Sequence, residues 1–235
     1  MKKNVAAVFL LLIISVCPLF SETLPSFPLD VSKVNSFDRA FMQPYNGLLD
    51  DTATIVELGM LAAPGAFLLV PGADWFSDGL MYAETGIITF GTRYLLKKAF
   101  ARPRPCMYYG TYPQELIDEE DWNRSLPSGH TAMCFMSAAF VTYMFNTRYP
   151  DSKWKVPSIC AAYGIAAATG AMRVASGNHF VTDVLAGAVL GTVTGFGIPW
   201  VHDQVKEHFG VPGKASQTAV AAVISPFCIG FSINF

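Results

Sequence analysis

Charged side chains are scarce in this sequence. Lysine, arginine, aspartate and glutamate together make up 14% of its 235 residues, whereas about a quarter is usual for a soluble globular domain. The formal net charge is −2, so the chain lacks the basic field expected of a nucleic-acid-binding protein. Hydrophobic residues make up 52% of the chain. Length and composition therefore favour a single domain in a membrane setting.

Cysteine is also sparse, and its positions follow no pattern. Cys17, Cys134, Cys160 and Cys228 lie in apolar runs, and Cys106 alone falls in an expected loop. No cluster of cysteine and histidine has the spacing of a zinc site, and no disulfide framework emerges. The sequence implies no metal and no cofactor.

The N-terminus combines positive charge with an apolar run. Lys2 and Lys3 are followed by an uncharged stretch that extends to Ser21. This is the pattern of a secretory signal, but no clear pair of small residues marks a cleavage site before Glu22. Residues 1–21 are therefore either a signal peptide or a first membrane helix.

Long uncharged segments recur along the rest of the chain. Residues 58–73, 131–147, 156–172 and 184–201 contain no charged residue and no histidine, and residues 79–92 contain only Glu84. A membrane-spanning helix needs about 20 mainly apolar residues, and the polar ends of these segments can extend them. A soluble all-helical domain is the alternative. Five such segments exceed what a soluble core requires, so we expect an all-α transmembrane bundle of five to six helices with the active site at one end.

Small residues recur at helix-packing intervals within two of these segments. The two sets are Gly187, Gly191 and Gly195, and Ala162, Ala166 and Gly170. Such faces allow helices to approach one another closely in lipid.

The expected organisation has four parts. They are the signal peptide or first membrane helix at 1–21, an extramembrane segment at 22–52, a helical bundle at 53–205 and a tail at 206–235. The end of the tail alternates apolar and other residues from Phe227 to Phe235, which is typical of a strand. The sequence leaves open whether this tail is membrane-associated or extended.

Three short polar clusters at the edges of apolar segments hold the candidate chemistry. They are Lys97 with Arg104 and Pro105, then Pro127-Ser128-Gly129-His130, then Arg173 with His179 and Asp183. Together they contain three cations, two histidines, one carboxylate and a Ser-Gly turn. These groups can bind a tetrahedral oxyanion and carry out nucleophilic chemistry on it.

Local patterns suggest how these residues are placed. Ser128 is a natural N-cap residue, Gly129 allows the backbone to approach a ligand, and free N–H groups at a helix start bind anions. His179 and Asp183 are four residues apart, so on a helix they would share one face and the carboxylate could orient the imidazole. Lys98 and Arg102 are interpreted as positive charges at a membrane boundary. The acidic run from Asp118 to Asp121 is interpreted as a solvated loop face.

The order and spacing of the three clusters resemble the signature of the type 2 phosphatidic acid phosphatase and vanadium haloperoxidase superfamily. The segment from Arg173 to Gly187 is especially similar to the third motif of that superfamily. The family usually has serine before the third-motif arginine, and here that residue is Met172. This difference removes a hydroxyl and can alter phosphate affinity or substrate choice.

The resemblance implies a role for each candidate residue. It implies that His179 is the nucleophile that forms a phosphohistidine, that Asp183 orients it, and that His130 protonates the leaving alcohol. It also implies that phosphate is bound by Lys97, Arg104, Ser128, Gly129 and Arg173.

The expected function is that of a membrane phosphatase acting on a lipid phosphate or diphosphate monoester in the bilayer. Alternatives with the same pocket are a vanadate-dependent haloperoxidase, a soluble periplasmic non-specific acid phosphatase, or a catalytically weak binding protein. Positive charges at Lys2, Lys3, Lys153 and Lys155 fit the cytoplasmic side. We therefore expect a multi-pass protein of a bacterial-type inner membrane, with the active site facing the periplasm.

Overall fold

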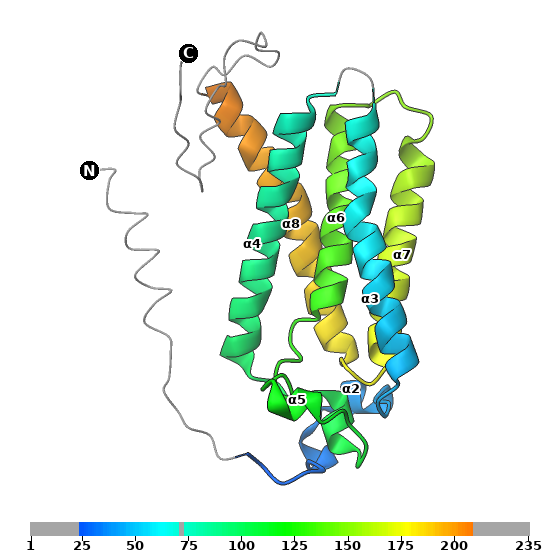
Figure 1. Cartoon of the computed structure of the whole chain (residues 1–235), viewed down its shortest axis with the longest axis vertical. Coiled ribbons are helices and arrows are strands. Elements are labelled where there is room, and N and C mark those ends of the chain that lie inside the picture. The colour runs from blue at the N-terminus through cyan, green and yellow to red at the C-terminus, as the bar shows by residue number, and fades with distance from the viewer. Residues whose placement is uncertain (1–23, 71–72, 209–235) are drawn as a thin grey trace, which may run out of the picture.

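Helices form all the regular secondary structure in the part of the chain that the structure describes. The computed structural model describes residues 24–70 and 73–208 (Figure 1). Five long helices form a bundle: α3 (Gly47–Ala62), α4 (Trp75–Phe100), α6 (Gly129–Thr147), α7 (Lys155–Ala175) and α8 (Val181–His208). The shorter elements are η1 (Val31–Lys33), α2 (Ser36–Ala40), η2 (Ala63–Leu69), η3 (Pro105–Tyr108) and α5 (Glu115–Asp118), of which the η elements are 3₁₀ helices. The predicted all-α fold class is confirmed.

The described helices extend slightly beyond the expected bundle range of 53–205. The side chain of Asn46 accepts a hydrogen bond from the backbone N–H of Leu49, which caps α3 and allows it to begin at Gly47. At the other end of the chain, α8 continues to His208. The predicted signal peptide or first membrane helix at 1–21, and the alternating end of the tail, lie outside the described residues.

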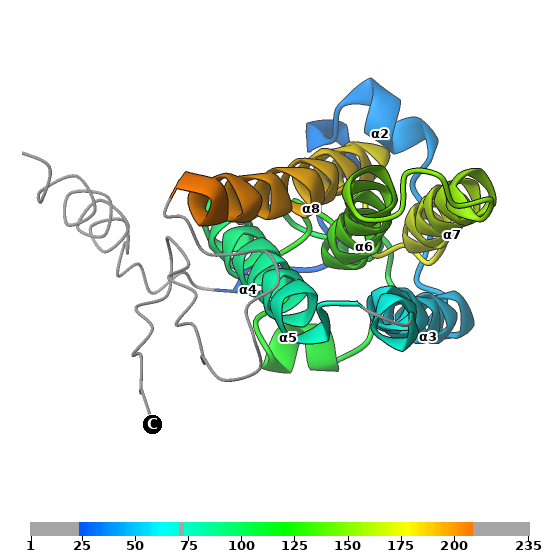
Figure 2. The same ribbon diagram turned by 90° about the horizontal axis from the view of Figure 1, so that it is seen from above.

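Helix α6 lies at the centre of the bundle. Viewed along the bundle, it is surrounded by α3, α4, α7 and α8 (Figure 2). It packs closely against α8 because the glycines of α8 have no side chain at the contact. A Cβ at Gly191 would lie 2.1 Å from the carbonyl oxygen of Ala132, and a Cβ at Gly195 would lie 2.3 Å from the carbonyl oxygen of Met136. On α7, Ala162 and Ala166 are buried in a cluster with residues of α3 and α6. Both predicted small-residue faces are therefore packing faces.

The distribution of apolar and ionisable side chains is the one expected for a helical bundle surrounded by lipid. Helices α7 and α8 are each long and apolar enough to cross a membrane by length and composition. Apolar side chains such as Ile87, Val156 and Val189 are exposed on the outside. Inside, by contrast, Nδ1 of His202 lies 3.0 Å from a carboxylate oxygen of Glu84, and both side chains are buried. Ionisable groups that face the interior of a bundle are typical of membrane helices.

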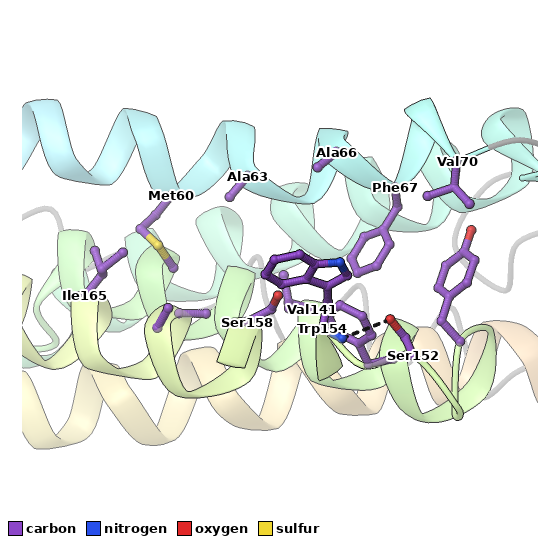
Figure 3. Close-up of a pocket in the computed structure, with 14 residues that line it drawn as sticks. Met60, Ala63, Ala66, Phe67, Val70, Val141, Ser152, Trp154, Ser158 and Ile165 are labelled. Carbon is purple, nitrogen blue, oxygen red and sulfur yellow. Dashed lines mark hydrogen bonds between the residues drawn. The ribbon is translucent and has the colours of Figure 1, made fainter. Parts of the chain in front are cut away.

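An apolar cavity of about 570 Å³ lies between α3, η2, α6 and α7. Met60, Phe67, Val141 and Trp154 are among the residues that line it (Figure 3). These residues lie on the halves of the helices that are remote from the three polar clusters, so the cavity is separate from the candidate site.

The opposite end of the bundle is covered by irregular chain. Residues 101–128, which include α5, and the segment before α3, which includes α2, gather at this end (Figure 1). Helix α4 ends here because Ala101 adopts a left-handed conformation, with φ of 42°, and Pro103 follows within two residues. The candidate residues lie under this cover.

Candidate active site

The three sequence clusters meet at the covered end of the bundle. Lys97 lies in the last turn of α4, and Arg104 directly precedes η3. Ser128, Gly129 and His130 form the start of α6, and Arg173 lies in the last turn of α7. His179 lies between α7 and α8, and Asp183 lies in the first turn of α8. All eight candidate residues are therefore at helix ends facing the same region.

His179 is at the centre of this region and is only 1% exposed. Its Nδ1 lies 2.8 Å from the carbonyl oxygen of Ser125. Because a carbonyl oxygen only accepts hydrogen bonds, we assign the proton to Nδ1, which leaves a lone pair on Nε2. Burial, and after it the positive charges of Arg104 and Arg173, hold the pKa of His179 well below its usual value of 6.5. The imidazole is thus neutral at pH 7, as a nucleophile must be.

The relation between His179 and Asp183 differs from the predicted one. Helix α8 begins only at Val181, because the chain turns at Gly177, whose φ is 71°. The two side chains therefore do not share a helix face, and the nearer carboxylate oxygen of Asp183 lies 3.8 Å from Nδ1 of His179. That oxygen instead accepts hydrogen bonds from the backbone N–H of Phe180, at 2.8 Å, and from the hydroxyl of Ser125. Ser125, which the sequence did not single out, contacts both Asp183, through its hydroxyl, and the imidazole, through its carbonyl oxygen.

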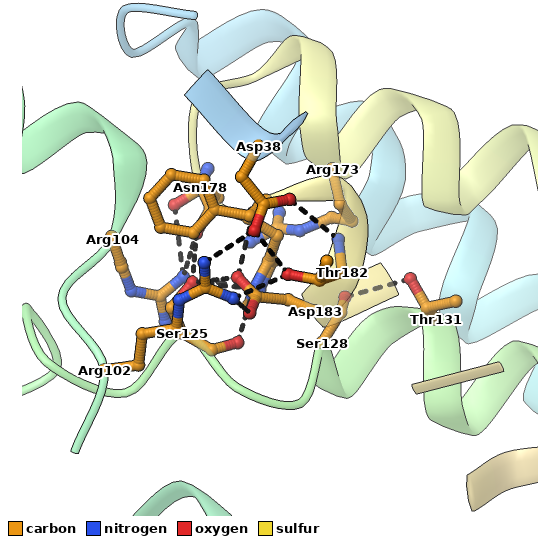
Figure 4. A network of polar contacts seen from close by, with 12 residues as sticks. Asp38, Arg102, Arg104, Ser125, Ser128, Thr131, Arg173, Asn178, Thr182 and Asp183 are labelled. Atoms are coloured by element: carbon orange, nitrogen blue, oxygen red, sulfur yellow. Dashed lines mark hydrogen bonds and ion pairs between the residues drawn. The ribbon is translucent and has the colours of Figure 1, made fainter. Parts of the chain in front are cut away.

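Arg102 belongs to this site, and its interpretation as a simple boundary charge is wrong. Its guanidinium lies 2.6 Å from Asp183 and 2.7 Å from Asp38, and it also donates to the hydroxyl of Thr182 at 2.7 Å (Figure 4). The same group lies 4.1 Å from the centre of the Phe180 ring. One side chain thus joins the motif-three carboxylate to a carboxylate of the N-terminal segment.

Asp38, in α2, is fully buried and was missed by sequence reasoning. Its carboxylate accepts from the hydroxyl of Thr182 at 2.6 Å, from the backbone N–H of Thr182 at 3.1 Å and from Asn35 at 2.7 Å. Burial raises the pKa of Asp38, but the hydrogen bonds from Thr182, Arg102 and Asn35 outweigh burial and hold the pKa below its usual value. No local sequence pattern connects Asp38 with Thr182, which lies 144 residues further along the chain.

Each of the two candidate phosphate-binding arginines is held by a carboxylate. Arg104 forms an ion pair with Asp121, and Arg173 forms one with Asp50. Asp121 is an exception to the interpretation of its acidic run as a solvated face, whereas Asp118, Glu119 and Glu120 are exposed as expected. The Nε of Arg173 is buried and has no hydrogen-bond partner among the described residues. This N–H is a donor available to a ligand.

The start of α6 differs from the expected cap. Ser128 occupies the N-cap position, but its hydroxyl lies 2.9 Å from the hydroxyl of Thr131 and caps no backbone N–H. At Gly129, a Cβ would lie 2.0 Å from a terminal guanidinium nitrogen of Arg93 of α4, so a larger residue here would displace the end of that side chain. Arg93 was not predicted as a site residue, although it lies one turn before Lys97 on the same face of α4. Backbone donors at the start of α6 therefore lie beside two cations.

His130 faces α3 across the start of α6. Its Nε2 lies 3.0 Å from the hydroxyl of Thr54 and 3.2 Å from a carboxylate oxygen of Glu57. Neither of these two residues was among the candidates from the sequence. The site as a whole combines a neutral buried imidazole, a second imidazole and five cations, which is an arrangement that can bind and attack an oxyanion.

The sequence profile of the PAP2 superfamily matches residues 78–207, which is more than half of the chain. The chain belongs to the PAP2 superfamily. The matched range contains all three polar clusters and the helices α4, α6, α7 and α8. Asp38, Asp50 and Glu57 lie before it, so three carboxylates that contact residues of the site come from chain outside the PAP2 match.

Three curated relatives of this PAP2 chain are phosphatases by name. Lipid phosphate phosphatase 1 of Arabidopsis thaliana is 28% identical over 181 residues, which cover 61% of this chain and 54% of that protein. Lipid A 1-phosphatase of Porphyromonas gingivalis is 35% identical over 81 residues, which cover 34% of this chain and 17% of that protein. Phosphatidylglycerophosphatase B of Bacillus subtilis is 28% identical over 211 residues, which cover 85% and 95%. The chain thus spans only part of the first two relatives and nearly all of the third.

Two solved structures are similar to this PAP2 chain. LpxE of Aquifex aeolicus aligns with a TM-score of 0.49 and 21% identity, covering 72% of this chain and 98% of that one. A transmembrane PAP2-type phosphatidylglycerolphosphate phosphatase from Bacillus subtilis aligns with a TM-score of 0.49 and 22% identity, covering 88% and 98%.

Proposed function

We propose that this chain is a membrane phosphatase that hydrolyses a lipid phosphate or diphosphate monoester through a phosphohistidine intermediate. The observation that supports this most strongly is the environment of His179. Its imidazole is buried and neutral, with the unprotonated Nε2 3.4 Å from the guanidinium of Arg104. A nucleophile next to fixed cations suits phosphoryl transfer, in which catalysis is mostly positioning and charge stabilisation.

In the proposed first step, Nε2 of His179 attacks phosphorus while Lys97, Arg104 and Arg173 bind the phosphoryl oxygens. The bond between phosphorus and the lipid oxygen breaks, its electron pair stays on the oxygen, and the oxygen takes a proton from His130. The backbone N–H of Gly129 adds a donor at the start of α6, whereas that of Ser128 donates to the carbonyl oxygen of Asp183 at 3.0 Å. Loss of one such charge-stabilising contact typically costs about 3–4 kcal/mol in the transition state.

In the second step, water attacks the phosphohistidine. His130, now neutral, takes a proton from this water, and the electron pair of the phosphorus–nitrogen bond returns to His179. Inorganic phosphate is released, and both histidines return to their starting states. The proposed cations already neutralise the phosphoryl charge, so no divalent metal is required in this scheme.

The names of the relatives support a lipid substrate. All three act, by their names, on phosphate groups of lipids. The exposed apolar surface of the bundle also suits a substrate that lies in the bilayer.

We predict that the purified protein releases inorganic phosphate from one or more lipids of a panel containing phosphatidate, phosphatidylglycerol phosphate, a polyprenyl diphosphate and lipid A. Activity is expected to persist in excess EDTA and to be inhibited by vanadate, which takes up the five-coordinate geometry of the displacement. Loss of activity in EDTA that returns with Mg²⁺ would contradict the mechanism. Bromide-dependent oxidation by the vanadate-loaded protein, without phosphate release, would favour the haloperoxidase alternative.

We further propose that the site faces the periplasm of a bacterial-type inner membrane. Arg148, Lys153 and Lys155 gather at the remote end of the bundle, as expected for the cytoplasmic side. The covered end contains Lys98, Arg102 and Arg124, which count against this orientation, but Arg102 is balanced by Asp38 and Asp183, and Arg124 lies 3.8 Å from Glu120. The cluster of positive charges at the remote end is the observation that supports the proposed orientation.

Cysteine labelling tests this orientation. Cys106 is buried in η3, and burial raises the pKa of its thiol to about 11, so it is unsuitable as a probe. Thr111 and Asp151 are exposed at opposite ends of the bundle. In a variant whose five native cysteines are replaced, we expect a membrane-impermeant thiol reagent to label Thr111→Cys in cells with a permeabilised outer membrane. Asp151→Cys should react only after lysis, and the reverse pattern would place the site in the cytoplasm.

A further inference from the structure

One face of α3 presents three polar side chains to the site. Asp50, Thr54 and Glu57 follow one another at intervals of four and three residues, so they lie on the same side of the helix. Asp50 is paired with Arg173. Thr54 and Glu57 both contact one atom, the Nε2 of His130, at 3.0 and 3.2 Å. Helix α3 therefore supports the second histidine of the site as well as one of its arginines.

The contacts of Nε2 indicate where the proton of His130 lies. The hydroxyl of Thr54 donates to the carbonyl oxygen of Asp50 at 3.1 Å, so its oxygen is left to accept from His130. An ionised carboxylate can only accept. With two acceptors around it, Nε2 carries a proton that points toward α3. Nδ1, which has no hydrogen-bond partner among the described residues, is then the nitrogen available to a substrate.

The charges around His130 make a counter-charge necessary. Burial, and after it the charges of Arg173, Arg93 and Lys97, all oppose a positive charge on this imidazole, while the carboxylate of Asp50 favours one. Of the two carboxylates of α3 in this region, Asp50 is engaged by Arg173, whereas Glu57 touches the imidazole itself. The side chain of Glu57 is only 12% exposed, so water screens its charge weakly.

We propose that Glu57 is the positioning residue that, together with the negative charge of the bound phosphate, holds His130 in its doubly protonated form, with Nδ1–H directed to the leaving alcohol. In the proposed first step, Nδ1 gives its proton to the oxygen as the phosphorus–oxygen bond breaks. The proton on Nε2 stays on His130 throughout and remains hydrogen-bonded to Glu57. The carboxylate therefore balances the imidazolium but does not itself transfer a proton. This proposal rests on the proposed phosphatase function.

The dependence of the hydrolysis rate on the leaving group tests this role of Glu57. An alkoxide is a poor leaving group and needs protonation as it departs, whereas 4-nitrophenolate departs without it. A residue that acts only by holding the fold, or by binding phosphate, would affect both kinds of substrate alike. A residue that acts through the general acid affects the alkyl ester selectively.

The experiment compares Glu57→Gln with wild type on an alkyl phosphate and on 4-nitrophenyl phosphate. We expect kcat on the alkyl ester to fall by about 10–100-fold, within the range that general acid catalysis supplies, and kcat on the nitrophenyl ester to change by less than about threefold. His130→Ala should show the same selectivity, and Glu57→Gln in that background should add little more. Glu119→Gln, at an exposed position in the loop, is the matched control and should resemble wild type on both esters.

The outcomes separate the two levels of the proposal. Hydrolysis of neither ester by wild type, together with inactivity on the lipid panel, would overturn the phosphatase function itself. Hydrolysis of both by wild type with an equal loss in Glu57→Gln, or with no loss, would overturn the role of Glu57 alone. If Glu57→Gln does not fold, Glu57→Asp keeps the charge at a shorter reach and should show a smaller loss with the same selectivity. An equal loss on both esters in that variant would also contradict the proposal.

Discussion

Replacing His179 by alanine is expected to abolish phosphatase turnover while leaving the protein folded. In the proposed mechanism no other group can accept the phosphoryl group, because the neutral Nε2 next to Arg104 is the nucleophile. Removal of a catalytic nucleophile costs several powers of ten in kcat, so we expect a loss of at least about 10⁴-fold. His130→Ala removes the general acid and should lower kcat by about 10²–10⁴-fold on an alkyl ester.

One of the two other histidines supplies the control. His208 is the last residue of α8, at the end of that helix remote from the site, and His208→Ala should keep near-normal turnover. Rapid acid-free quenching of wild type with radiolabelled substrate should trap phosphate on the protein, and His179→Ala should trap none. Near-normal turnover of folded His179→Ala would show that the nucleophile lies elsewhere.

The features that the sequence predicted correctly depend on local patterns. Uncharged runs mark the long helices because a buried or lipid-facing segment excludes charge. The series Gly187, Gly191 and Gly195 predicted a close helix contact because its spacing matches one face of a helix, and the structure places α6 against that face. The motif residues could be chosen because each motif is short and continuous.

The features that the sequence did not reveal are partners distant along the chain. Asp38 contacts Arg102 across 64 residues, Asp50 contacts Arg173 across 123, and Thr54 contacts His130 across 76. Each of these groups looks like an ordinary polar residue in its own neighbourhood. Only the folding of α2 and α3 against the motif helices gives them a role, and no periodicity in the sequence encodes that packing.

Arg102 is the clearest example of this limit, and it leads to the second large effect. In the sequence, Lys98 and Arg102 both follow an apolar run, and both are interpreted as positive charges at a membrane boundary. In the structure the two differ. Lys98 is exposed and lies over the ring of Tyr94, whereas Arg102 joins two fully buried carboxylates.

Arg102→Ala is therefore expected to reduce both stability and activity. The substitution leaves Asp38 and Asp183 without their cation inside the protein, and breaking a buried ion pair typically costs about 3–5 kcal/mol of unfolding free energy. It also releases the carboxylate that positions Ser125 and, through it, His179. We expect a clearly lower midpoint of thermal unfolding and a fall in kcat of about 10²-fold or more, in line with the loss of one stabilising contact in an active site.

Two further variants separate charge from geometry. Lys98→Ala removes a positive charge four residues away in the chain and should leave both the unfolding midpoint and kcat close to wild type. Arg102→Lys keeps the charge but cannot donate to Asp38, Thr182 and Asp183 at once, because an ammonium lacks the planar fork of a guanidinium. It should therefore recover part of the stability and little of the activity. Equal, small effects of Arg102→Ala and Lys98→Ala would mean that Arg102 is a boundary charge after all, and that Asp183 keeps its position through Ser125 and the backbone of Phe180 alone.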